Sequence, residues 1–148
     1  MQVAIPMRAG PGRDRAVAAF HDAIGLLRTH DPTRLARIQR EFHRIVLFDA
    51  GRRIQVGSFN PRLRICGVNA GYLTDKPSGA ALIVVSVLAH EAMHGVLARL
   101  GYGDARAMDP ATLRRVERLC RKAEWAVLSR IPQPDAQRER LAEIYATT

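Results

Sequence analysis

Hydrophobic residues recur at helical spacing through the first part of the chain. Between Arg13 and His30 they fall every three or four positions, which is the period of an amphipathic helix. Asp31 and Pro32 follow as an N-cap and a first-turn proline, so a second helix is predicted to run to about Phe42. Residues 1–12 contain two prolines and two glycines and are predicted to form a strand fragment or a loose arm.

The pattern then changes to short apolar runs separated by turn residues. Three strands are predicted, over residues 44–48, 53–58 and 63–69. Ala50-Gly51 and Asn60-Pro61 supply the turns between them. Strands joined by such turns are typical of hairpins and meanders, so we expect a small, three-stranded, mostly antiparallel sheet.

Two further helices are predicted after the strands. The first covers residues 79–100 with Ser78 as its N-cap, and its first half is apolar on every side, as in a helix buried in the core. Asp109-Pro110 opens the second, which runs to about Ile131 because two prolines follow. Residues 133–148 are predicted to form a tail that adds one amphipathic helix or frays.

The composition is that of one folded α+β domain spanning residues 1–148. Hydrophobic residues make up 47% and charged residues 25%, the balance of a globular protein. The longest apolar run, Ala80 to Ala89, is far shorter than the roughly 20 residues that a membrane-spanning helix needs. The N-terminus lacks the apolar stretch of a secretion signal, so we expect a cytoplasmic protein with no membrane partner. Nothing in the sequence indicates an oligomeric state.

The chain carries a formal charge of +9, and 21 of its 23 basic residues are arginine. Such an excess favours an anionic partner, including nucleic acid. The arginines are scattered, however, without a basic block or interleaved aromatic residues, so a nucleic-acid partner is an alternative that we do not favour. Cys66 and Cys120 are far apart in sequence, and we expect two buried thiols and no disulfide.

The motif that carries chemistry is His90-Glu91-Ala92-Met93-His94, an HExxH sequence in the predicted buried helix. Residues four apart lie on the same helical face, so His90 and His94 can direct two imidazoles at one Zn²⁺ ion. Glu91 stands beside the metal, where it can take a proton from zinc-bound water. Histidines and a glutamate in an apolar helix are costly to bury without such partners. The simpler alternative is a pair of hydrogen-bonded core histidines without metal.

A catalytic zinc needs a third protein ligand, and no histidine follows His94. If the motif helix ends near residue 100, the histidines lie about 12 Å back from that end. In a helix that returns from Pro110, Glu117 lies about 10 Å along and Glu124 about 21 Å along. Antiparallel packing therefore favours Glu117 as the third ligand, with Glu124 as the alternative.

Other residues are candidates for lesser roles. Cys120 shares a helical face with Glu117 and Glu124, where we expect it to pack, although a thiol near zinc is also a competing ligand. Tyr72, Tyr102 and His43 are candidate donors to a developing oxyanion, and the sequence favours none of them.

With HExxH and a downstream helical glutamate, the chain resembles the gluzincins. The order of helix, short sheet, motif helix and glutamate helix is similar to small bacterial zinc peptidases of the ImmA/IrrE type, over roughly Arg44 to Pro132. That family places a small residue and then Asn or Asp at the third and fourth positions after its ligand glutamate. Here Cys120 fits, but Arg121 does not. The resemblance implies a minimal zincin-like fold whose substrate adds to the edge strand, expected at Leu63–Asn69.

The sequence therefore predicts a zinc metallopeptidase in which Glu91 activates the water that attacks a peptide bond. Its partner would be a peptide or protein substrate. The alternatives are a catalytically silent metal-binding protein and a nucleic-acid-associated regulatory protein.

Overall fold

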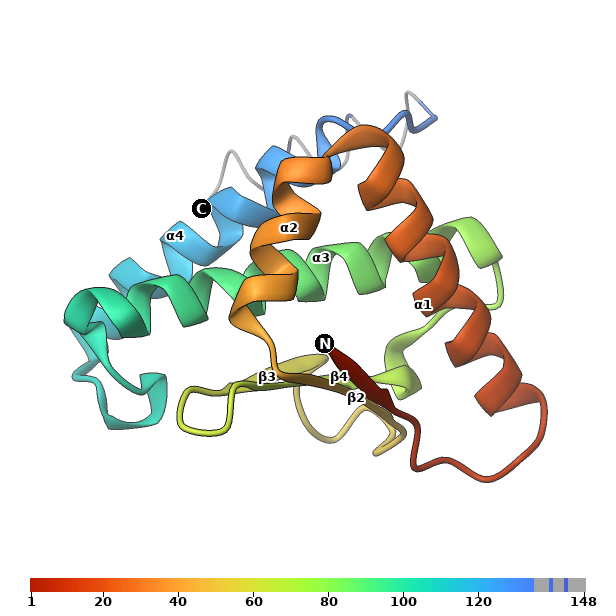
Figure 1. The fold of residues 1–148 in the computed structure, drawn as a ribbon, viewed down its shortest axis with the longest axis horizontal. Helices are drawn as coiled ribbons and strands as arrows, with labels where there is room; N and C mark the ends of the chain where they lie inside the picture. Colours follow the sequence, from red (N-terminus) through yellow and green to blue (C-terminus); the bar gives the residue numbers. More distant parts are fainter. Residues whose placement is uncertain (135–138, 140–142, 144–148) are drawn as a thin grey trace.

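All four main helices lie on one face of a small sheet (Figure 1) in the computed structural model, which describes residues 1–134 together with Glu139 and Glu143. The predicted tail, residues 133–148, therefore falls almost wholly outside the described residues. The elements follow the order β1 (Gln2–Ala4), α1 (Pro11–His30), α2 (Pro32–Glu41), β2 (Arg44–Phe48), β3 (Gly57–Asn60), β4 (Ile65–Asn69), α3 (Pro77–Leu97) and α4 (Pro110–Leu128). Short helical turns span Ala70–Tyr72, Ala98–Tyr102 and Ala105–Ala107. The α+β class is confirmed.

The sheet is mixed, with four strands in the order β1-β2-β4-β3. β1 and β4 both pair with β2 in parallel, and only β3 and β4 are antiparallel. The prediction of a three-stranded, mostly antiparallel sheet is therefore wrong. Of the two alternatives for residues 1–12, the strand fragment is found, and as β1 it adds a fourth strand to the sheet. After β2 the chain passes beyond the position of β4, forms β3 at the edge and then returns as β4, so β2 and β3 are consecutive in sequence but not neighbours in the sheet.

The predicted edge strand is also wrong. β4 lies between β2 and β3, and β3 forms the edge on that side of the described sheet. The strand expected over 53–58 begins only at Gly57, because the preceding loop is held by other contacts. The side-chain amide nitrogen of Asn69 donates to Gly51 O over 2.8 Å, and the side-chain oxygen of Asn69 accepts from the backbone N–H of Ala50 over 3.1 Å.

Two of the predicted helix N-caps, Asp31 and Asp109, are confirmed. Asp31 accepts a hydrogen bond from the Arg34 amide over 3.1 Å, and Asp109 accepts one from the Thr112 amide over 3.0 Å. These are the N-caps of α2 and α4. Ser78 is not a cap, because α3 already begins at Pro77 and its N-cap residue makes no side-chain bond.

Helix α3 is the centre of the core. It packs against α1, α2, α4 and the sheet, and its buried side chains include Val84, Val85 and Leu88. The segment 77–102 is long and apolar enough to cross a membrane by length and composition, but 61% of its most apolar window is buried inside the protein. Helix α3 is apolar on several sides because it packs against other helices and the sheet on those sides. Cys66 and Cys120 are both buried and free, as predicted.

Candidate metal centre

His90 and His94 lie one turn apart on α3 and direct their rings to the same carboxylate. The ring centroids are 5.1 Å apart. Nε2 of His90 lies 3.1 Å from Glu117 Oε2, and Nε2 of His94 lies 2.9 Å from Glu117 Oε1. Both histidine side chains are less than a fifth exposed. Three side chains from two helices thus converge on one point.

Glu124 occupies a different position around His90. Its Oε1 atom lies 3.2 Å from Nδ1 of that ring, on the edge away from Glu117, and also accepts a hydrogen bond from Ser86 Oγ over 3.1 Å. Because Glu117 contacts His94 and Glu124 reaches back to Ser86, α4 runs antiparallel to α3. This packing is the arrangement on which the ranking of the two glutamates depended.

Cys120 adds a fourth group to the cluster. Donor atoms of His90, His94 and Cys120 all lie within 4.8 Å of one another, so these three residues could hold a metal ion. The thiol is fully buried. Burial and the neighbouring Glu117, Glu91 and Glu124 charges raise the pKa of the thiol well above its usual range, so the thiolate is strongly disfavoured.

Electrostatics in the metal-free site favour a protonated His90. Burial alone lowers its pKa, but hydrogen bonds to Glu117 and Glu124 and the charges of Glu91 and Glu124 together raise it to about 10. The same two histidines hold the pKa of Glu117 well below its usual range. His90 therefore carries a proton near neutral pH, and a cation that binds its ring nitrogen would displace that proton.

Glu91 is buried next to these residues, with 7% of its surface exposed. Burial raises its pKa, and the charges of His90 and His94 oppose that shift. The edge strand passes close by, because a Cβ added at Gly57 would lie 2.9 Å from Glu91 Oε1 and 2.6 Å from Val87 Cγ1. A glycine inside a strand is a signal of such close approach.

These residues line a cleft of about 830 Å³ between β3 and helices α3 and α4. One wall is the continuous segment 55–60, and the other carries His90, Glu91, His94, Glu117 and Glu124. Residues 103–106 close one end, and Arg121 also borders the cleft. The edge strand and the histidines therefore border the same cleft.

Comparison with known protein families, with curated proteins and with solved structures finds no match for this chain. The resemblance to zincins stays a prediction that depends on the HExxH motif and its surroundings. Metal coordination by His90, His94 and Glu117 also stays a prediction.

The structure does not bring the three candidate oxyanion donors into the cleft. Tyr72 donates its hydroxyl to Ile54 O over 2.6 Å and holds the loop before β3. Neither Tyr102 nor His43 borders the cleft among the described residues. Sequence reasoning missed Gly57, Arg106 and Arg121, which do border it. Of these, only Gly57 had a local signal, as a glycine within a predicted strand.

Proposed function

We propose that this protein is a zinc-dependent hydrolase that cleaves peptide bonds. The observation that carries the proposal is the convergence of both Nε2 atoms on Glu117, beside the buried carboxylate of Glu91. Two histidines and one carboxylate are a common protein ligand set of catalytic zinc, which leaves a coordination position open.

The donor set fits zinc in a second respect. Histidines that bind metal usually donate their other ring N–H to a carboxylate or carbonyl, which fixes the ring and its tautomer. Glu124 takes this place on Nδ1 of His90, and Ser86 in turn donates to Glu124. Glu124 is therefore assigned as an orienting residue, and Glu117 as the third ligand. Cys120 is assigned to packing, because its thiol pKa is far above neutral.

Each residue then has a defined task. Zinc held by His90, His94 and Glu117 would supply Lewis-acid chemistry and lower the pKa of a bound water toward neutrality. Glu91 accepts a proton from the attacking water and delivers it to the leaving amine. Because burial raises its pKa, the protonated form of Glu91 is a milder acid that persists nearer to neutral pH, which suits the second transfer.

The edge of the sheet supports a peptide as substrate. Asn69 N–H bonds to Val56 O over 2.8 Å, and the register pairs Gly57 with Val68. Since hydrogen-bonded and non-hydrogen-bonded pairs alternate in an antiparallel ladder, the backbone groups of Gly57 and Phe59 point away from β4. A peptide pairing with these groups would extend the sheet and lie opposite the histidines.

The test combines metal content with turnover. We expect about one zinc per chain in the wild type, and Glu91→Gln should retain zinc while losing peptide cleavage by about a hundredfold or more. Glu139→Gln, an exposed glutamate, is the matched control and should behave as wild type. Full activity in Glu91→Gln would refute the mechanism. Zinc without cleavage of any peptide pool would favour the silent metal-binding alternative.

A further inference from the structure

A second cavity adjoins the proposed catalytic cleft and is lined by arginines. It measures about 690 Å³ and lies between the end of α2, the β3–β4 turn and the segment after α3. We call it the arginine pocket; its charged lining residues are Glu41, Arg62, Arg64, Arg99, Asp104 and Arg106. It shares Phe59, Asn60 and residues 103, 104 and 106 with the cleft. A single extended ligand can therefore occupy both.

The charges of the arginine pocket do not cancel. Arg99 binds the buried Glu41 carboxylate through two nitrogens. Arg106 binds Asp104, with Nη2 2.7 Å from Oδ2. In the described part of the chain, no carboxylate lies within ion-pair distance of Arg62 or Arg64, and the charge of Arg62 acts on Asp104 only from further away, where it helps Arg106 to lower the pKa of that carboxyl. Two positive charges are thus left over at the mouth of the cleft.

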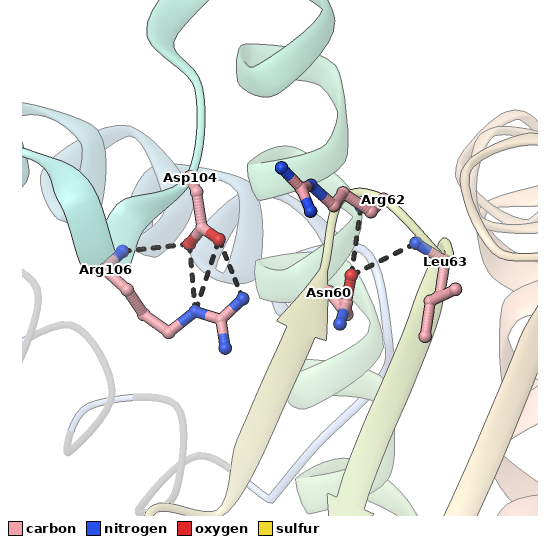
Figure 2. Close-up of polar contacts among 5 residues, drawn as sticks. All are labelled: Asn60, Arg62, Leu63, Asp104 and Arg106. Atoms are coloured by element: carbon pink, nitrogen blue, oxygen red, sulfur yellow. Dashed lines mark hydrogen bonds and ion pairs between the residues drawn. The ribbon is translucent and has the colours of Figure 1, made fainter.

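Hydrogen bonds hold the side chain of Arg64 and the backbone of the turn that carries Arg62. Arg64 directs its guanidinium to the carbonyl oxygens of Arg40 and Glu41 at the end of α2, with Nε 3.1 Å from Glu41 O. The Asn60 side chain accepts from the Arg62 and Leu63 amides over 3.0 and 3.1 Å. Figure 2 shows this turn and places the Arg62 side chain toward the loop that carries Asp104 and Arg106. An anion would therefore meet a preformed turn.

The spacing between Glu91 and the arginine pocket indicates which residue of a bound peptide would reach the pocket. Gly57 is level with Glu91, and Asn60 is three residues further along β3, which is about 10 Å at the rise of a strand. On α3, Gly95 lies four residues past Glu91, about 6 Å at the rise of a helix, and its Cβ position is 3.3 Å from Phe59 Cζ. Because a paired peptide shares the rise of β3, its second or third residue from the scissile bond reaches the pocket.

Building on the proposed function, we propose that the arginine pocket is a specificity subsite for an acidic side chain, aspartate or glutamate, two or three residues from the scissile bond. A single carboxylate would neutralise one of the two surplus positive charges of Arg62 and Arg64. A nucleic acid matches less well, because its phosphates would pass Glu41 and Asp104 in the pocket and Glu91, Glu117 and Glu124 in the cleft.

Cleavage of two peptides that differ at one position tests this subsite. The zinc-loaded full chain is given peptides that differ only by Glu or Gln, with the substitution moved one position at a time. We expect a preference of about fivefold for Glu in kcat/KM at one of these two positions, expressed mainly in KM and weakened by salt. Arg62→Gln should abolish the preference, and Arg62→Glu should transfer it to a Lys peptide. Arg8→Gln, which removes an exposed arginine outside both cavities, should keep it.

Binding separates this inference from the proposed function. Fluorescence anisotropy of labelled Glu and Gln peptides needs no turnover, so an Arg62-dependent preference for the Glu peptide supports the subsite even in a chain that cleaves nothing. Cleavage without a Glu preference, or a preference that survives in Arg62→Gln, would overturn the subsite and leave the hydrolase standing. Equal binding of both peptides together with displacement by a single-stranded DNA oligonucleotide would overturn it in favour of nucleic acid.

Discussion

Gly57 on the edge strand faces Glu91 on the motif helix with no room for a side chain between them. A Cβ at Gly57 would lie 2.9 Å from Glu91 Oε1 and 2.6 Å from Val87 Cγ1, closer than real Cβ contacts. The absence of a side chain here lets the edge strand, the proposed binding edge for substrate, approach the proposed general base. The same contact makes a prediction about catalysis.

Gly57→Ala should displace Glu91 and lower kcat by about a hundredfold, since a shift near 1 Å at a catalytic group has an effect of that size. Zinc content should be unchanged, because the atoms nearest to the added Cβ belong to Val87 and Glu91 and not to the proposed metal ligands. Gly25→Ala is the control: nothing lies within 4 Å of its Cβ position in α1, and we expect unaltered activity with roughly 0.5–1 kcal/mol of added stability. Normal turnover by Gly57→Ala would contradict the placement of Glu91.

The two helical glutamates should have different effects on zinc affinity. Glu124→Gln removes the acceptor on Nδ1 of His90, and loss of such an orienting partner weakens metal binding by about 10–100-fold. Glu117→Gln should weaken it more, because it removes a ligand. Competition with a chromophoric chelator measures both. The reverse order of effects would make Glu124 the third ligand.

Cys120 provides an independent check on the ligand set. Cys120→Ser keeps the volume nearly constant, and if the thiol only packs, zinc affinity should change by less than about threefold. Packing of a hydroxyl at this buried position should instead lower the free energy of unfolding by about 1–2 kcal/mol. A large loss of zinc with normal folding would show that the cysteine is a ligand.

Zinc uptake should release a proton. His90 has a pKa of about 10 in the metal-free site, so near neutral pH its imidazole is charged and zinc must replace the proton on Nε2. Zinc affinity is therefore expected to rise about tenfold per pH unit between pH 7 and pH 9. Calorimetry in buffers of different ionisation enthalpy counts the released proton. Affinity independent of pH over this range would contradict the network with Glu117 and Glu124.

The stability of the metal-free protein should follow the same groups. The folded pKa of His90 is raised, so its contribution is fully present below the unfolded value near 6.5 and is lost as pH rises through about 10. The folded pKa of Glu117 is lowered, so its contribution is present above about 4.3 and is lost toward acid. We therefore expect the highest Tm of the metal-free protein between about pH 4.3 and pH 6.5. Zinc should raise Tm more at pH 9 than at pH 6.

Local features of this chain could be predicted from the sequence because their causes are local. The N-caps Asp31 and Asp109 bond to amides three residues away, and the burial of α3 follows from its apolar surface. The spacing of His90 and His94 places both on one helical face whatever surrounds the helix. The position of Glu117 level with the histidines needed only helix rise and antiparallel packing, which the contacts with His94 and Ser86 display.

Tertiary contacts decided the rest, because those features join residues far apart in the chain. Short apolar runs do not encode which strand pairs with which, so the place of β1 beside β2 and of β3 at the edge could not be derived. Glu124 contacts the far edge of His90 only because α3 and α4 pack together. Arg62 and Arg64 likewise come to lie beside Glu41 and Asp104 only when separate elements pack. Period and capping determined the elements and the motif, whereas the packing of strands and helices determined the shape of the cleft and its surplus charge.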